Sequence, residues 1–225
     1  QFIRSINSVK IDRGVISKYS GRSKGMIISN TLLTLSGLFP ILFIGKYYSL
    51  NTLGQYSLVM ATVFLPSGLI GSAVGNVFYQ RSAIYWNEGD IIGLKNLWKE
   101  TLIKLIAVAA PIYLVIFIVS PWAYLFFFGE NWTLAGELAQ IMAFAAFFSF
   151  LAGPLDRLSL VYGLSYYLPL IHIIRLSFLV ILIAAAKVLS LNQVTFMFAF
   201  SLVMTFVYIV ERLQNTEYCS QKRIK

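Results

Sequence analysis

This sequence has few charged residues, and that shortage decides its class. Only 12% of its 225 residues are charged and 58% are hydrophobic, and the mean hydropathy is +0.76. Soluble domains carry about 25% charged residues and fewer apolar ones. The composition therefore excludes an ordinary soluble domain and predicts an integral membrane protein with several spans.

Cysteine, histidine and acidic residues are scarce as well. One Cys and one His exclude a disulfide framework and a Cys/His metal site. We find no Gly-rich phosphate loop in a soluble context, and we expect no carboxylate inside any span that could couple transport to protons or sodium. The sequence therefore predicts a protein that is not an enzyme and that holds no metal and no cofactor.

The net charge of +9 would indicate a nucleic-acid partner in a soluble protein. In a membrane protein, however, Lys and Arg collect in the cytoplasmic loops. We therefore expect membrane lipids, and no nucleic acid, among the partners.

The apolar residues fall into six runs, each long enough to cross the ~30 Å hydrocarbon core as a helix. We expect an all-α six-helix bundle over residues 25–212, with spans at about 25–45, 53–80, 102–128, 134–155, 168–187 and 191–210. Residues 1–24 form a basic juxtamembrane segment, either solvated or lying on anionic headgroups as an amphipathic helix. Residues 81–100 form an interfacial stretch, and residues 213–225 form a polar tail.

The second run has an unusual composition. No charged side chain lies between Lys46 and Arg81, and Pro66 in its middle is followed by several small residues, among them Gly71 and Gly75. Small residues let helices approach closely in a membrane. We expect a packed and bent helix around which the rest of the chain is organised.

The positive charges predict the orientation. If the amino terminus is inside, only Lys46 and Lys187 of the 18 Lys and Arg residues lie outside, and Arg175 lies within a span. The other 15 are then inside, so both termini are predicted to be cytoplasmic. The chain starts at Gln1, and we expect a piece of a longer protein or a trimmed chain.

Arg175 and His172 are the main candidates for a binding site. They share a face of the fifth helix, with Arg175 about 10 Å from the start of the helix. A charge at that depth costs at least ~2.5 kcal/mol, so it needs a partner or a wet cavity. Arg175 either binds an anion such as a phosphate or acidic sugar, or it makes a structural pair with a carbonyl or carboxylate, or it lies at a re-entrant turn.

A second polar line follows the second helix at four-residue steps and includes Ser72 and Asn76. The Gly71/Gly75 pair on this helix forms a GxxxG motif, which most often marks a packing face. Packing is the favoured interpretation of the line, and cavity lining is the alternative.

Four segments resemble one known family. LGQYSLVMATVFLPSGLIGSAVGNVFYQRSA followed by NEGD is similar to the carboxy-terminal half of bacterial polysaccharide flippases, the O-antigen-type translocases of the multidrug/oligosaccharidyl-lipid/polysaccharide exporter superfamily. KYSG (18–21), FFGENWTLAG (127–136) and GPLDRLSLVYG (153–163) extend the resemblance over about residues 18–220. Asn76 departs from it, because Gln is expected there.

The resemblance implies a twelve-span transporter of two six-helix lobes in the bacterial inner membrane, with this chain as one lobe and an amino-terminal lobe as its partner. Such proteins move undecaprenyl-pyrophosphate-linked sugars to the periplasmic leaflet by alternating access, so a lipid-linked oligosaccharide is the expected substrate. The family supplies no universal catalytic residue. Two alternatives stay open: a membrane-embedded enzyme that modifies or polymerises polysaccharide, and a self-standing six-helix scaffold.

Overall fold

The structure is a computed structural model that describes residues 13–162 and 167–221, and the side chains of residues 25–162 and 168–211. Nearly all of this part of the chain is helical. The elements are α2 (Arg13–Tyr47), α3 (Leu50–Val63), α4 (Leu65–Glu88), α5 (Ile91–Phe128), the short 3₁₀ helix η1 (Glu130–Trp132), α6 (Thr133–Leu155), α7 (Leu158–Val161), α8 (Tyr167–Val188) and α9 (Gln193–Gln221).

Six helical stretches are long and apolar enough to cross a membrane: Gly25–Tyr47, Leu50–Glu88, Ile91–Phe128, Glu130–Val161, Leu168–Val188 and Gln193–Glu211. The prediction of an all-α membrane protein with six spans is therefore confirmed for the described residues. The predicted segment 1–24 lies partly outside them, because residues 1–12 are not described and only the backbone of 13–24 is. That backbone is the first part of α2.

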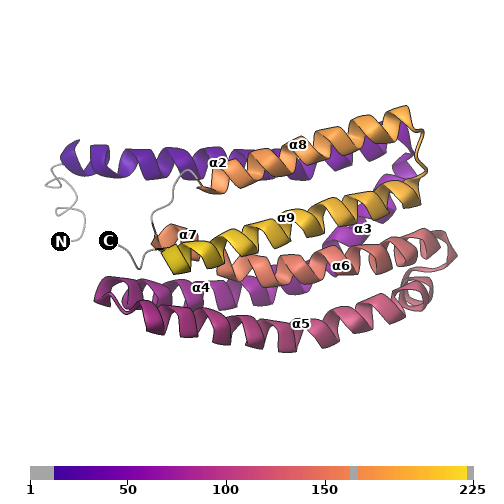
Figure 1. The fold of residues 1–225 in the computed structure, drawn as a ribbon. Coiled ribbons are helices and arrows are strands. Elements are labelled where there is room, and N and C mark those ends of the chain that lie inside the picture. Colours follow the sequence, from indigo (N-terminus) through magenta and orange to yellow (C-terminus); the bar gives the residue numbers. More distant parts are fainter. Residues whose placement is uncertain (1–12, 163–166, 222–225) are drawn as a thin grey trace, which may run out of the picture.

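The long helices run roughly parallel or antiparallel and form an elongated bundle (Figure 1). In this view α2 and α8 lie together along one side and α4 and α5 along the other, with α6 and α9 between them. The start of α2, the α4–α5 turn and the carboxyl end of α9 lie at the same end of the bundle. An even number of crossings requires this arrangement.

The centre of the bundle is α6, which packs against α3, α4, α5 and α9. Of its apolar span, 61% is buried, against 22% for the α3–α4 span. Small side chains let its neighbours come close: a Cβ added to Gly136 would lie 2.8 Å from the Cα of Pro121 on α5. The expectation that the second span organises the bundle is therefore wrong, because the Ala-rich α6 permits closer packing on more sides.

The predicted bend in the second span is present. The helix is interrupted at Phe64, and α4 restarts with Pro66 in its first turn, where the missing N–H of proline leaves no hydrogen bond unmade. The span is thus built from two helices, α3 and α4.

Residues expected as an interfacial stretch are almost wholly helical. α4 continues to Glu88, Gly89 ends it with a φ of 73°, and Asp90 caps α5 by accepting a 2.8 Å hydrogen bond from the backbone N–H of Gly93. With 38 residues, α5 is about 57 Å long. It is therefore longer than the ~30 Å hydrocarbon core and extends beyond it.

Two hydrogen bonds join the α2–α3 turn to the start of α9 at the opposite end of the bundle. The Tyr48 hydroxyl donates to the Leu191 carbonyl at 2.9 Å, and the Thr52 hydroxyl donates to Oε1 of Gln193 at 2.7 Å. They fix the α8–α9 turn beside the α2–α3 turn, and from there α9 packs along α6 and α8.

Candidate functional site around Arg175

A buried ion pair links α8 to α9. Nη2 of Arg175 lies 2.6 Å from Oε1 of Glu211, and the two side chains are only 7% and 4% exposed. Arg175 stands about two turns into α8, and Glu211 lies on α9, directly after the apolar run that ends at Val210. The deep charge therefore has a carboxylate partner on a neighbouring helix.

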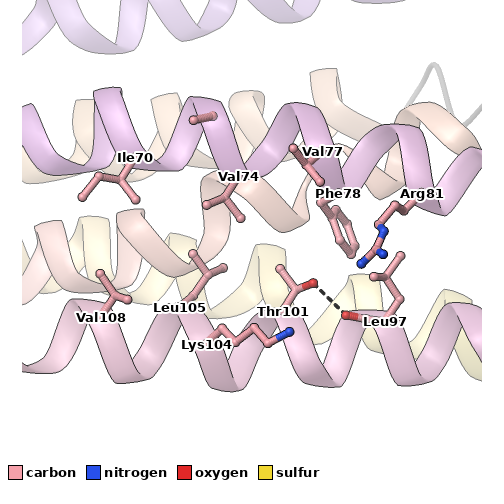
Figure 2. A pocket seen from close by; sticks show the side chains of 11 residues that line it. Ile70, Val74, Val77, Phe78, Arg81, Leu97, Thr101, Lys104, Leu105 and Val108 are labelled. Carbon is pink, nitrogen blue, oxygen red and sulfur yellow. Dashed lines mark hydrogen bonds between the residues drawn. The ribbon is translucent and has the colours of Figure 1, made fainter.

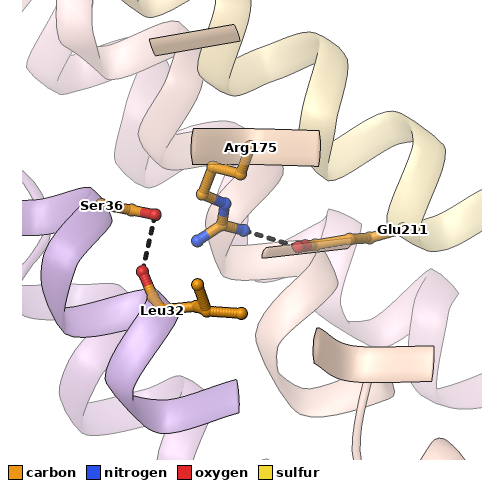
Figure 3. Close-up of polar contacts among 4 residues, drawn as sticks. All are labelled: Leu32, Ser36, Arg175 and Glu211. Carbon is orange, nitrogen blue, oxygen red and sulfur yellow. Dashed lines mark hydrogen bonds and ion pairs between the residues drawn. The ribbon is translucent and has the colours of Figure 1, made fainter. Parts of the chain in front are cut away.

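The pair does not use all of the hydrogen-bonding capacity of the guanidinium. Nε of Arg175 is buried and has no hydrogen-bond partner among the described residues. The Tyr208 ring on α9 lies 5.0 Å from the guanidinium carbon, within cation–π range. Figure 3 shows the guanidinium between Glu211 and the stretch of α2 that carries Leu32 and Ser36.

Arg175 also forms part of the wall of a cavity. The cavity has a volume of about 520 Å³, and residues of α2, α3, α8 and α9 line it. The polar side chains in its wall besides Arg175 are Thr34 and Ser36 from α2, Tyr56 and Ser57 from α3, and Tyr208 from α9. Such a mixture of apolar wall and a few convergent polar groups is typical of a ligand site.

Three polar residues of α2 in or near this cavity are exposed, and of them Thr34 lines it. Asn30, Thr31 and Thr34 are all exposed, and the two threonine hydroxyls donate only to carbonyls of their own helix, those of Ile27 and Asn30. Polar groups facing lipid are unfavourable. This face of α2 is therefore suited to contact with water or with another helix.

His172 lies one turn before Arg175 on α8. Its side chain is 8% exposed and its Nδ1 has no hydrogen-bond partner among the described residues. It is not among the residues that line the cavity. The two predicted site residues on α8 are therefore close together, but only Arg175 reaches the cavity.

Ser72 and Asn76 lie elsewhere. Both are on exposed positions of α4; the Ser72 hydroxyl donates to the Leu69 carbonyl at 3.1 Å, and the Asn76 carbonyl oxygen accepts a 2.7 Å hydrogen bond from Nη1 of Arg157. Neither lines the cavity at Arg175. The structure thus does not bring the two pairs of predicted residues into one site.

The adjacent glycines of α4 do pack, as the GxxxG motif indicates. Gly71 and Gly75 are buried against the end of α6 and the residues that follow it. A Cβ at Gly75 would lie 3.3 Å from the Cα of Pro154 and 2.7 Å from Nε of Arg157. The absence of a side chain at Gly75 is what allows Arg157 to reach Asn76.

Glu211 is the residue that the sequence analysis missed. It was expected to follow the last span, but the structure places it inside α9, buried beside Arg175. The expectation of no carboxylate in any span also overlooked Glu137, which lies within the predicted span 134–155. No Pro or Gly follows Val210 in the printed sequence, and α9 continues to Gln221. The absence of a helix breaker is the signal that could have placed Glu211 on a helix beside Arg175.

The chain matches the model of a known protein family. A family model described as "Polysaccharide biosynthesis protein" matches residues 2–136, which is more than half of the 225 residues. The matched range contains α2 and α3, which line the cavity, and ends before α8 and α9. No curated protein and no solved structure matches the chain. The chain therefore belongs to the polysaccharide biosynthesis protein family.

Proposed function

We propose that this chain is one lobe of a flippase that moves lipid-linked oligosaccharides across the bacterial cytoplasmic membrane. The observation that carries the proposal is the cavity at Arg175, which places a guanidinium within the membrane part of a polysaccharide biosynthesis protein. The reaction is transport and not a covalent step, so no catalytic residue is assigned and no metal or cofactor is required.

The chemistry of the substrate agrees with such a cavity. A pyrophosphate that crosses the bilayer needs a positive group, because an isolated anion in hydrocarbon is strongly unfavourable. Arginine binds phosphate oxygens through paired N–H donors, and Nε of Arg175 has no protein partner among the described residues. We propose that the pyrophosphate takes these donors while Glu211 keeps the empty site neutral.

The exposed polar face of α2 supports a second lobe. Asn30, Thr31 and Thr34 would face either that lobe or the water-filled space between the two lobes. Alternating access then follows when the two lobes rock about a shared cavity. An amino-terminal six-helix lobe, in the same longer chain, is the partner proposed here.

The orientation is proposed from charge. With both termini in the cytoplasm, 15 of the 18 Lys and Arg residues fall in cytoplasmic segments of the sequence, as the positive-inside rule requires. Glu211 then lies at the cytoplasmic end of its span, and Arg175 meets a substrate that enters from the cytoplasmic leaflet.

The species that accumulates after gene deletion tests the function. Loss of a flippase leaves single repeat units on their lipid carrier with the sugar facing the cytoplasm. Loss of a polymerase leaves single repeat units that already face the periplasm, and loss of a modifying enzyme leaves full-length polymer without the modification. We expect the first result; either of the other two would overturn the proposal in favour of an enzyme.

A further inference from the structure

A second cavity lies between α4 and α5, apart from the one at Arg175 (Figure 2). It is an open groove of about 420 Å³. Its wall is apolar along most of its length, with Ile70, Val74 and Phe78 on α4 facing Leu105 and Val108 on α5. The groove thus has the surface that a hydrocarbon chain requires.

The polar residues of the groove are Arg81, Thr101 and Lys104. The Thr101 hydroxyl is already used, because it donates to the Leu97 carbonyl at 2.7 Å. Arg81 extends from α4 toward Leu97 on α5, and the Lys104 side chain runs along α5 toward the same end of the groove (Figure 2). Arg81 therefore lies at one end of an apolar groove, and Lys104 extends from the middle of the groove toward that end. The described lining residues include no acidic one.

The length of the groove fits one leaflet of a bilayer. From Arg81 to Ile70 the groove follows α4 for eleven residues, about 16 Å of helix. The hydrocarbon core is ~30 Å thick, so each leaflet supplies about half of that. A headgroup at Arg81 and Lys104 would therefore place an acyl chain beside Ile70, near the middle of the membrane.

We infer that the α4–α5 groove binds an anionic phospholipid, whose phosphate contacts Arg81 and Lys104 and whose acyl chain lies along Val74, Leu105 and Val108. Basic pockets between transmembrane helices are suited to anionic headgroups. The site is separate from the cavity at Arg175 and does not depend on the proposed transport function.

One acidic residue stands near the proposed headgroup position. Oε2 of Glu100 lies 3.6 Å from Nζ of Lys104, with both side chains more than half exposed. Exposed pairs one helical turn apart contribute only about 0.3–0.5 kcal/mol. A phosphate can therefore replace Glu100 as the partner of Lys104 at little cost.

Native mass spectrometry of the purified full-length protein in detergent tests the inference. The probes are phosphatidylglycerol and phosphatidylcholine with the same acyl chains, and glycerol phosphate, which has the anionic group without the chains. We expect one tight adduct with phosphatidylglycerol, weaker binding of phosphatidylcholine and no adduct with glycerol phosphate. Equal affinity for the two lipids would contradict the inference.

The decisive variant is R81Q/K104Q. Each cation near a headgroup contributes about fivefold in affinity, so losing both should weaken phosphatidylglycerol binding roughly 25-fold. Both side chains are exposed, so the variant should fold normally. The matched control is K95Q/K99Q, which removes two charges from α5 outside the groove lining. If the control loses as much affinity for phosphatidylglycerol as R81Q/K104Q, the lipid is attracted by the overall positive charge and not by this groove, and the inference is wrong.

Two further variants separate the chain-binding part from the charge. Ala73→Phe adds a ring at an exposed lining position and should weaken both lipids at least fivefold, while Glu100→Gln should tighten phosphatidylglycerol about twofold. No effect of Ala73→Phe would place the lipid elsewhere. If the protein is a dimer and Ala73→Phe dissociates it, a second copy of the chain occupies the groove. If polyprenyl pyrophosphate displaces phosphatidylglycerol at a tenth of the phosphatidylglycerol concentration, the transport substrate occupies it. Either result contradicts the inference.

Discussion

Replacing Arg175 alone should destabilise the protein, because it leaves the Glu211 carboxylate buried without its partner. The two charged atoms are 2.6 Å apart and the side chains are 7% and 4% exposed. Removing one member of a buried ion pair costs about 3–5 kcal/mol. For a protein of this size that corresponds to a fall in Tm on the order of 10 °C.

Removing both charges should restore most of the lost stability. We choose Arg175→Met, which keeps an unbranched apolar stem without the guanidinium, and Glu211→Gln, which keeps the shape of the acid. Replacing a buried ion pair with uncharged groups of similar volume is often neutral or stabilising. The double variant should therefore unfold within a few degrees of the wild-type protein, whereas each single variant should unfold well below it.

Transport separates the structural role from the functional one. The assay measures surface polysaccharide in cells that carry each variant, normalised to the amount of protein in the membrane. If Arg175 holds the pyrophosphate, the double variant is stable yet loses most of its output. Wild-type output from the stable double variant would refute the proposed role in binding and leave Arg175 as a structural residue.

Two other predictions follow from the packing and from the charges. Gly136→Ala should lower the free energy of unfolding by about 1–3 kcal/mol, measured by thermal unfolding, because its Cβ would lie 2.8 Å from the Pro121 backbone. Gly153→Ala on the same helix has no such neighbour and should be neutral. Equal effects of the two variants would contradict the α5–α6 packing. Reporter fusions should read periplasmic after Lys46, Trp132 and Leu189 and cytoplasmic after Asp90, Arg157 and Tyr218, and a periplasmic reading at Tyr218 would contradict the orientation.

Much of the fold could be predicted from the sequence because its signals are local. Six long apolar runs determine six spans, and Pro66 alone marks the break between α3 and α4. The Gly71/Gly75 spacing likewise indicated a packing face. These features depend on the chain near each residue and on the membrane, and not on which helices become neighbours.

The central position of α6 and the partner of Arg175 could not be read in the same way. Both depend on which helices meet: α6 is central because four helices contact it, and Glu211 is buried because α9 continues past the apolar run and packs beside α8. Ser72 and Asn76 were assigned from their spacing on one helix. That spacing does not tell whether α4 turns this face toward the cavity at Arg175, and the structure turns it elsewhere.

Translocation in a reconstituted system tests the central proposal most directly. The purified full-length protein is placed in liposomes with a fluorescent undecaprenyl-pyrophosphate oligosaccharide, and a membrane-impermeant reagent that reacts with the sugar reports which leaflet holds it. We expect the sugar to become exposed on the opposite leaflet much faster than in protein-free liposomes, and we expect the R175M/E211Q variant to abolish this acceleration. No acceleration by the wild-type protein would contradict the proposed flippase function.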